Sequence, residues 1–319
     1  MGEPARVMTH EPTPGRGAGP FDLGDHAAYR RWRAWKLACH PARVEDLVVE
    51  IADPRALAAA ERAALLDRIG RANMALYRSP VREEDRALPR RLGAQLGLHR
   101  LDAHWLADED GISSIAVHDP AAAPRAAAER GAFIPYTDRA IRWHTDGYYH
   151  PEGRRIRGMI LHCVRPAASG GVNRLLDHEM AYIALRDASP AHVHALMQPD
   201  AMTIPAREGD SGVARAAQAG PVFSVDPRDG SLHLRYTART RSIEWKDDAA
   251  TRDAVRSLED LLASDARGMF TVRMDAGMGL VGHNVLHDRS AFADDPAHPR
   301  LLYRARFLDH VQGLPAPPC

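Results

Sequence analysis

The stretch Arg142–Tyr149 constrains this chain more than any other, because it places an imidazole, His144, two residues before a carboxylate, Asp146. In a β-strand, residues i and i+2 point to the same face, so these two side chains can converge on one ion. A third ligand must come from elsewhere, and His287, within the segment 282–292, is the candidate. Two imidazoles and one carboxylate on one face of a metal leave its other positions open, as in non-haem Fe(II) sites.

A metal site assembled from segments so far apart needs a fold that brings distant strands together. Period-two patterns and turn signals predict strands at 47–51, 74–78, 112–117, 156–164, 174–177, 222–225, 232–236, 270–274, 279–286 and 301–308. Helical patterns cover 25–39, 54–73, 179–186 and 248–264. The Asp229-Gly230 pair predicts a hairpin turn. We therefore expect a β-rich α+β fold, a cupin-like jelly-roll barrel with flanking helices.

The length of the chain predicts a single domain. With 319 residues and 45% hydrophobic content, the chain can bury one large core. Residues 1–20 are rich in Pro and Gly and are expected to form a flexible tail. The domain would then span 21–319, with a helical and βαβ portion at 21–105 and the jelly-roll core at 106–310.

Charge and cysteine content limit the partners. Lys+Arg and Asp+Glu are equal at 42 each, so no overall charge favours nucleic acid or an anionic membrane. Cys39, Cys163 and Cys319 form no CxxC pair, and no run reaches the roughly 18 apolar residues that span a bilayer. We expect a cytoplasmic protein whose partner is a small-molecule substrate, without nucleic acid or membrane partners; a homo-oligomer is compatible with the sequence.

The ordered motifs carry a family resemblance. His144-Thr145-Asp146, followed by His287, Arg289 and Phe292, resembles the HxD and distal HxRxxF motifs of TauD/TfdA-like Fe(II)- and 2-oxoglutarate-dependent dioxygenases. That family includes taurine dioxygenase, γ-butyrobetaine hydroxylase and clavaminate-synthase-like enzymes. The resemblance covers about residues 45–310 and implies a double-stranded β-helix, with the two motifs on distant strands.

The resemblance also implies the chemistry. His144, Asp146 and His287 would be the catalytic metal ligands, with Fe(II) as cofactor, 2-oxoglutarate as cosubstrate and O2 as oxidant. The expected reaction is hydroxylation of a small carboxylate, sulfonate or betaine, with release of succinate and CO2. Because Asp146 supplies a carboxylate ligand, halogenation is not expected.

A cosubstrate site follows from the same resemblance. In such enzymes an Arg shortly after the distal His pairs with the far carboxylate of 2-oxoglutarate, and Arg300 stands in that position. Residues 300, 302, 304 and 306 share one strand face, so Arg304 and Arg306 would point the same way. Arg304 is therefore a second candidate for cosubstrate binding, whereas Arg306 is expected to be structural. Asn173 stands where the family's GGxT segment has Thr, and its amide can still bind a carboxylate.

The substrate pocket is the least constrained part. Arg304 matches the offset of the arginine that binds the substrate anion in taurine dioxygenase; an internal salt bridge to an aspartate is the alternative. Tyr148, Tyr149 and Tyr236, with Trp245, could form an aromatic cage for a quaternary ammonium group, or simply pack the barrel wall. Arg235 is a further candidate for an anionic substrate.

Three alternatives stay open. His283 is a rival to His287 as the third ligand, because a continuous strand would place both on one face, although only His287 fits HxRxxF. His162 and His233 lie in apolar strands and are expected in the core or the cavity wall. A cupin-like Zn(II) or Mn(II) hydrolase or isomerase would use the same three ligands without needing Arg300. A non-catalytic ligand-binding barrel would keep only the pocket.

Overall fold

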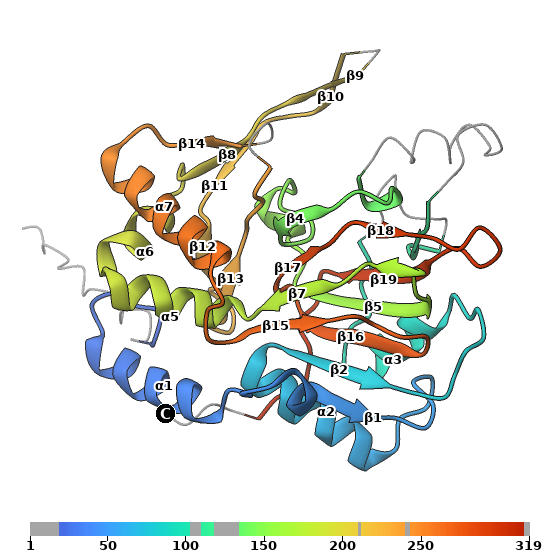
Figure 1. The fold of residues 1–319 in the computed structure, drawn as a ribbon. Helices are drawn as coiled ribbons and strands as arrows, with labels where there is room; N and C mark the ends of the chain where they lie inside the picture. Colours follow the sequence, from blue (N-terminus) through green and yellow to red (C-terminus); the bar gives the residue numbers. More distant parts are fainter. Residues whose placement is uncertain (1–18, 103–109, 118–133, 210–211, 240–242, 316–319) are drawn as a thin grey trace, which may run out of the picture.

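Two β-sheets that face each other form the centre of the molecule (Figure 1). The computed structural model describes residues 19–102, 110–117, 134–209, 212–239 and 243–315. The six-stranded sheet has the order β1 (Val48–Glu50), β2 (Met74–Arg78), β16 (Met278–His283), β5 (Gly158–Arg165), β19 (Leu301–Phe307), β3 (Ser113–Ile115). The four-stranded sheet has the order β15 (Met269–Val272), β7 (Asn173–Leu176), β17 (Leu286–Arg289), β4 (Ile141–His144).

The space between the sheets is filled by apolar side chains from both of them. Leu76, Leu161 and Leu280 from the six-stranded sheet belong to the same buried cluster as Leu175 and Phe270 from the four-stranded sheet. Alternate residues of a strand point to opposite faces, so each sheet contributes one apolar face to this core. The pairing is antiparallel throughout both sheets except between β1 and β2, which are parallel.

Two helices cover the outer face of the six-stranded sheet. These are α2 (Ala59–Ala72) and α3 (Leu88–Gln95), whose buried leucines join the outward-facing residues of the sheet in a second cluster. Helix α2 ends at Asn73, whose backbone is left-handed with φ of 59°. Asparagine tolerates this conformation well, so the chain turns directly into β2.

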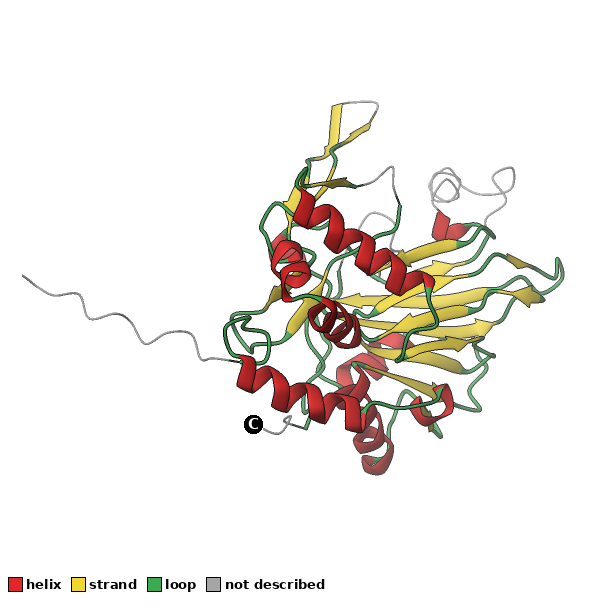
Figure 2. Cartoon of the chain, turned by 60° about the vertical axis from the view of Figure 1, so that its left-hand side comes forward, coloured by secondary structure: helices red, strands yellow, loops and turns green. Residues whose placement is uncertain are grey.

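A helical lobe packs against one end of the sheets (Figure 2). It consists of α1 (His26–Cys39), α5 (His178–Ala188), α6 (Pro190–Leu196) and α7 (Ala249–Ala263). The side chains of Asp25, Asp177, Ser189 and Asp248 accept hydrogen bonds from the first turns of these helices. An aromatic group that includes Trp32, Tyr182 and Phe223 fills the interior of the lobe.

The remaining strands and helices are short. The short strands are β6 (Ser169–Gly170), β8 (Met202–Ile204), β9 (Arg207–Gly209), β10 (Gly212–Arg215), β11 (Gln218–Gly220), β12 (Phe223–Val225), β13 (Leu232–Leu234), β14 (Glu244–Trp245) and β18 (Phe292–Ala293). The 3-10 helices are η1 (Val44–Leu47), η2 (Ile134–Tyr136) and η3 (Glu152–Arg154). The β9–β10 hairpin projects from the body of the molecule (Figure 1).

Many of the predicted elements are present. The predicted strand 74–78 is β2, the hairpin at Asp229-Gly230 is β12–β13, and the N-terminal βαβ unit is confirmed by the parallel pairing of β1 with β2. The predicted helix 54–73 begins later, at Ala59, because Pro54 and its neighbours form a turn.

The predicted strand 279–286 is wrong, because the chain there forms two strands in two different sheets. β16 ends at His283 in the six-stranded sheet, and β17 begins at Leu286 in the four-stranded sheet. The backbone leaves the first sheet at Asn284, whose side chain bonds to the segment after β4 instead. Residues 283 and 287 therefore do not share a strand face.

Some expectations remain as they were. Most of the expected tail at 1–20, and Cys319, lie outside the described residues. Cys39 and Cys163 are free thiols. Within the described ranges, none of the helices combines the length and apolar character needed to cross a membrane.

Candidate active site

The two histidines of the motifs face each other across a pair of neighbouring strands. His144 on β4 and His287 on β17 are directly paired in the antiparallel register, and their ring centroids lie 4.2 Å apart. The Nδ1 atom of His144 is 2.9 Å from the carbonyl oxygen of Arg142, and that of His287 is 3.0 Å from the carbonyl oxygen of Val285. When Nδ1 carries the proton for these bonds, both Nε2 atoms keep a lone pair available for a metal.

Electrostatics favour the neutral form of His144. Burial, followed by the neighbouring His287 ring, lowers the pKa of His144 to about 3. A neutral imidazole is the form that ligates a metal, so His144 is ready to bind one at neutral pH.

Asp146 completes the group from a turn rather than from a strand. Strand β4 ends at His144, and Asp146 lies just beyond it, before Gly147 with φ of +66°. The candidate ligand atoms of His144, Asp146 and His287 all lie within 4.8 Å of one another. The expected convergence is therefore present, although it depends on the turn and not on the strand period. This arrangement could hold one metal ion.

The Asp146 carboxylate is held on one side and open on the other. Its Oδ1 atom accepts a hydrogen bond of 3.0 Å from Nη1 of Arg304, while its buried Oδ2 atom has no hydrogen-bond partner among the described residues. Burial alone would raise the pKa of Asp146, but Arg304 and then Arg306 hold it well below its usual range. The carboxylate is thus ionised, with one oxygen available to a metal.

Asn284 is a site residue that the sequence reading missed. Its Oδ1 accepts from the backbone N–H of Asp146 at 2.9 Å, and its Nδ2 donates to the carbonyl oxygens of Asp146 at 2.8 Å and Ile156 at 3.1 Å. One buried amide therefore fixes both backbone groups of the carboxylate residue. The available signal was an Asn inside a predicted strand, where Asn is depleted.

His283 does not approach the candidate ligands. Its Nδ1 atom lies 2.8 Å from Oδ1 of Asn73, and its ring contacts that of His310 edge to face at 5.6 Å. The argument that strand parity makes it equivalent to His287 fails because the strand breaks between them. His162 is a core residue, as expected, with Nδ1 2.9 Å from the hydroxyl oxygen of Tyr77.

The arginine and phenylalanine of the distal motif hold the segment that leads into β4. Arg289 donates to the carbonyl oxygens of Pro135, Thr137 and Arg139, and its guanidinium lies 4.7 Å from the ring centroid of Phe292. Burial, together with the nearby Arg300, lowers the pKa of Arg289 to about 9. These contacts tie β17 to the chain just before His144, which steadies the pairing of the two strands.

A polar pocket with an unpaired guanidinium lies between the two sheets. It is lined by Cys163, Pro166, Ala167, Gly170, Gly171, Asn173, Arg273, Met274, Arg300 and Leu302. Arg300 is buried, and its guanidinium lies 4.9 Å from the Phe292 ring centroid. Its Nη1 atom has no hydrogen-bond partner within the part of the chain that the structure describes. A buried cation without a partner is costly, so this pocket is suited to an anion.

Asn173 lines the same pocket as Arg300. Its Nδ2 donates to the carbonyl oxygen of Asp288 at 2.8 Å, and its buried Oδ1 has no partner. The turn before it needs glycine, because a Cβ on Gly170, with φ of +70°, would lie 2.2 Å from the carbonyl oxygen of Ala291. Cys163 is a lining residue that the sequence reading did not assign to this pocket.

The two later arginines of β19 have separate roles. Arg304 pairs with Asp146 and is not among the residues lining the Arg300 pocket, so the structure gives no support to Arg304 as a cosubstrate ligand. Arg306 pairs with the buried Asp102, and its Nη1 donates to the hydroxyl oxygen of Tyr149 at 3.1 Å. The structural role expected for Arg306 agrees with these contacts.

A second pocket, of about 430 Å³, adjoins Asp146. It is lined by Thr145, Asp146, Gly147, Tyr148, His150, Glu152, Arg155, Ile156, Ala219, Gly220, Pro221, His233 and Arg235. Tyr148 and Arg235 thus line a cavity, as expected for substrate contacts, and His233 lies in the cavity wall. Tyr149 lies beside the pocket, beneath Arg215, whose guanidinium is 5.6 Å from its ring centroid.

Tyr236 and Trp245 are packing residues and not a cage. Their rings lie 6.4 Å apart in the core of the helical lobe, and Tyr236 is fully buried. Tyr236 lines neither of the two pockets described above, so the structure argues against it as a substrate contact. Of the two interpretations that the sequence left open, packing is the one that fits Tyr236 and Trp245, because both side chains join the apolar core of the lobe.

Fold and site together define a class, the double-stranded β-helix proteins in which two imidazoles and one carboxylate can hold a metal. The family model described as "Taurine catabolism dioxygenase TauD, TfdA family" matches residues 41–306. The chain therefore belongs to the TauD/TfdA family, which confirms the expected family and fold.

Two curated relatives are uridine-5'-phosphate dioxygenases. The one from Amycolatopsis sp is 33% identical over 176 residues, which cover 52% of this chain and 60% of the relative. The one from Streptomyces sp is 34% identical over 179 residues, which cover 53% of this chain and 62% of the relative. The chain thus matches less than two thirds of either relative's length.

A solved structure shares the whole fold. The non-heme iron oxygenase OrfP, in complex with Fe and alpha-ketoglutaric acid, superposes with a TM-score of 0.55 and 17% identity, covering 87% of this chain and 90% of that chain. At this identity the likeness establishes the fold. Iron and 2-oxoglutarate are thus found in a neighbour of this fold, which agrees with the expected cofactors.

Proposed function

We propose that this protein is an Fe(II)- and 2-oxoglutarate-dependent oxygenase that oxidises a small anionic molecule and releases succinate and CO2. The observation that carries the proposal is the pairing of two adjoining features. Three converging ligand atoms include a buried carboxylate oxygen without a partner, and the neighbouring pocket contains a buried guanidinium nitrogen without a partner. A metal and a dicarboxylate would satisfy both.

His144, Asp146 and His287 hold the iron in this proposal. The backbone carbonyls behind the two imidazoles fix the orientation of their rings, while Arg304 and Asn284 fix the carboxylate. When bound, Fe(II) activates O2 at the expense of 2-oxoglutarate for attack on a substrate C–H bond. The protein contributes orientation and a cavity from which water is largely excluded.

Arg300 binds the far carboxylate of 2-oxoglutarate. Its planar guanidinium can donate two parallel hydrogen bonds to a carboxylate, and Asn173 lines the same pocket. The unpaired state of Arg300 favours this assignment over a cupin-like Zn(II) or Mn(II) hydrolase, which has no use for an anion at that position.

Arg304 can contribute to substrate binding as well as to the metal site. Its Nη1 donates to Asp146, whereas its buried Nε has no partner. Because the curated relatives act on a nucleotide according to their names, a phosphorylated substrate is a better candidate for this chain than a betaine. A phosphate, carboxylate or sulfonate would each suit these donors.

The test is spectroscopic. Anaerobic protein loaded with Fe(II) should develop a weak visible charge-transfer band on addition of 2-oxoglutarate. His287→Ala should abolish the band, and Arg300→Ala should raise the 2-oxoglutarate concentration needed by about 10- to 100-fold, because one charge-assisted pair is lost. His298→Ala, at an exposed site, is the matched control and should behave like the parent. Absence of the band in the parent, or no effect of Arg300→Ala, would refute the proposal.

A further inference from the structure

The second pocket, next to Asp146, is lined by two arginines and two acidic residues, together with two histidines. Its lining includes the guanidinium groups of Arg155 and Arg235 and the imidazoles of His150 and His233. The carboxylates in the lining are Asp146, which pairs with Arg304, and Glu152, whose side chain is 81% exposed. We propose that this pocket binds the phosphate group of a phosphomonoester substrate, and that Arg155 is the residue that determines this specificity; the inference rests on the proposed function.

Arg235 contributes charge to the pocket, but each of its three side-chain nitrogens already donates a hydrogen bond to a backbone carbonyl. Its Nε donates to the carbonyl oxygen of Tyr148 at 2.7 Å, its Nη1 to that of Met202 at 3.1 Å and its Nη2 to that of Gln218 at 2.6 Å. It therefore connects the segment after Asp146 to β8 and β11. We assign it a positioning role, whereas the sequence made it one candidate for a direct contact with an anionic substrate.

Arg155 differs in having only a weak partner. Its side chain is 11% exposed, and its ion pair among the described residues is with Oε1 of Glu152 at 3.0 Å. An ion pair with such an exposed carboxylate is worth little, because water competes for both groups. A phosphate entering the pocket can therefore displace Glu152 from Arg155.

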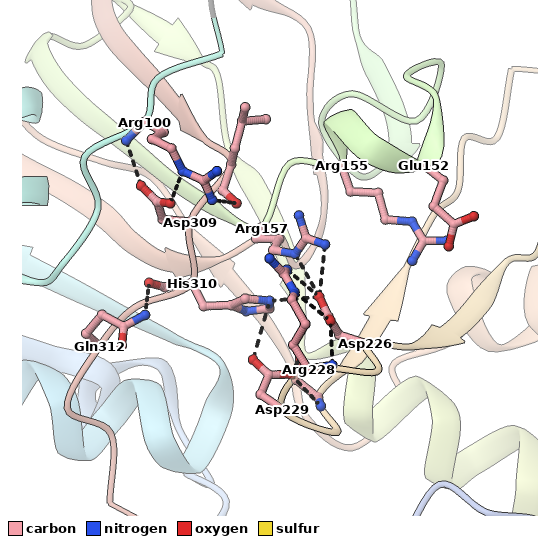
Figure 3. Close-up of polar contacts among 12 residues, drawn as sticks. Arg100, Glu152, Arg155, Arg157, Asp226, Arg228, Asp229, Asp309, His310 and Gln312 are labelled. Carbon is pink, nitrogen blue, oxygen red and sulfur yellow. Dashed lines mark hydrogen bonds and ion pairs between the residues drawn. The ribbon is translucent and has the colours of Figure 1, made fainter. Parts of the chain in front are cut away.

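The nearby Arg157, in contrast to Arg155, has a buried carboxylate as its partner. It binds Oδ2 of the buried Asp226 through Nε at 3.0 Å and Nη2 at 2.9 Å, and Asp226 also pairs with Arg228. Figure 3 shows this cluster, with Arg155 extending away from it toward Glu152. Arg157 is thus committed to the fold, and Arg155 is not.

The surrounding charges point the same way. Burial is the main cause that lowers the pKa of Arg155, and Arg157 lowers it further. Burial, then Arg155 and Arg215, lower the pKa of Arg235 to about 10. Cations that depress one another's pKa are stabilised by an added anion, and a phosphate with two negative charges is stabilised more than a carboxylate with one.

The position of the pocket also suits the reaction. Asp146 belongs both to the pocket lining and to the group of candidate iron ligands. A phosphate held by Arg155 would therefore keep the carbon skeleton attached to it close to the metal.

Binding of two related probes tests the inference without turnover. Anaerobic protein with Fe(II) and 2-oxoglutarate is titrated calorimetrically with uridine 5'-monophosphate and with uridine. We expect the phosphate ester to bind the parent at least tenfold more tightly. Arg155→Gln should weaken the ester by about 10- to 100-fold and leave uridine unchanged. Glu152→Gln should tighten the ester by a few-fold, because the competing carboxylate is gone. Arg78→Gln, at an exposed site on β2, is the control.

Several outcomes would overturn the inference. Equal affinity of the parent for both probes would do so, as would an equal loss for both probes in Arg155→Gln, which would indicate a structural role. If Arg155→Gln fails to fold, Glu152→Gln still tests the inference. Unchanged or weaker binding of the ester by Glu152→Gln would show that Glu152 and the phosphate do not compete for Arg155. The charge-transfer band in the same samples reports separately on the proposed function: a band without preferential ester binding refutes only the phosphate site.

Discussion

Arg304 donates a hydrogen bond of 3.0 Å from its Nη1 to Oδ1 of Asp146, and both side chains are buried. Among the described residues Oδ2 has no hydrogen-bond partner, while Oδ1 also lies 4.0 Å from Nε2 of His144. We predict that Arg304→Met weakens Fe(II) binding by about 10- to 100-fold, because a carboxylate that is no longer held loses its orientation. Loss of the positive charge of Arg304 would by itself strengthen Fe(II) binding, because it removes a repulsion. The sign of the change in Fe(II) affinity therefore shows which of the two effects is larger.

Competition with a graded chelator measures this effect. Arg304→Lys, which keeps the charge and loses the planar fork, should give an intermediate affinity. Tighter iron binding by Arg304→Met would show that repulsion between Arg304 and the metal outweighs the orientation of Asp146.

Asn284 should stabilise the fold as well as the site. Asn284→Ala removes three hydrogen bonds and leaves buried backbone groups of Asp146 and Ile156 unpaired. We expect the free energy of unfolding of the metal-free protein to fall by about 2–4 kcal/mol. Urea unfolding measures it, and a loss below about 1 kcal/mol would mean that water replaces the amide.

Gly147 is required by space as well as by backbone conformation. A Cβ there would lie 2.5 Å from Cγ1 of Ile156, and φ is +66°. Gly147→Ala should destabilise the protein by about 2–4 kcal/mol, measured by urea unfolding. Gly230→Ala is the matched control, since φ is +73° but nothing lies within 4 Å of the added Cβ, so only about 1 kcal/mol is expected. Equal losses for the two variants would exclude the clash with Ile156.

The fully buried ion pair of Lys36 with Asp177 should give stability a pH dependence. Lys36 Nζ lies 2.7 Å from Asp177 Oδ2. Burial lowers the pKa of Lys36, but Asp177 and Glu179 outweigh it and raise that pKa to about 12. A folded-state pKa above the ordinary value of 10.5 stabilises the protein below pH 10.5, and this contribution is lost as pH rises to about 12.

Asp177 gives the stability of the protein a second pH dependence, at acid pH. Burial opposes its ionisation, but Lys36 holds the pKa of the carboxyl well below its usual range, so its contribution is present above about pH 4 and is lost as pH falls further. Lys36→Met leaves Asp177 buried without this partner and should cost about 3–5 kcal/mol near neutral pH. Urea unfolding across the pH range compares parent and variant. If the free energy of unfolding of Lys36→Met falls at alkaline pH as steeply as that of the parent, Lys36 is not the cause of the alkaline loss of stability.

Local sequence patterns predicted those features that depend on near neighbours. Strand-forming runs of residues placed β2 and β19, and the Asp229-Gly230 turn placed the β12–β13 hairpin. Such patterns are encoded within one element, so they survive without knowledge of the rest of the chain.

The same reasoning failed where one element joins another. The apolar run 279–286 reads as one strand, yet it crosses from one sheet to the other at Asn284. The periodicity of a strand does not predict which sheet a residue joins, so the sequence made His283 equivalent to His287. Likewise, nothing in the pattern revealed that the guanidinium of Arg235 would be used by three carbonyl oxygens.

The sequence by itself determined the class of this protein, because the HxD and HxRxxF motifs name the residue types that a non-haem iron site needs. Only the tertiary structure decided how those residues are used. It paired His144 with His287 across two strands, gave Arg304 to Asp146, and left Arg300 and Arg155 without strong partners. The reason is physical: a motif fixes chemistry locally, whereas charge partners and pocket walls depend on strand register and packing contributed by the whole chain.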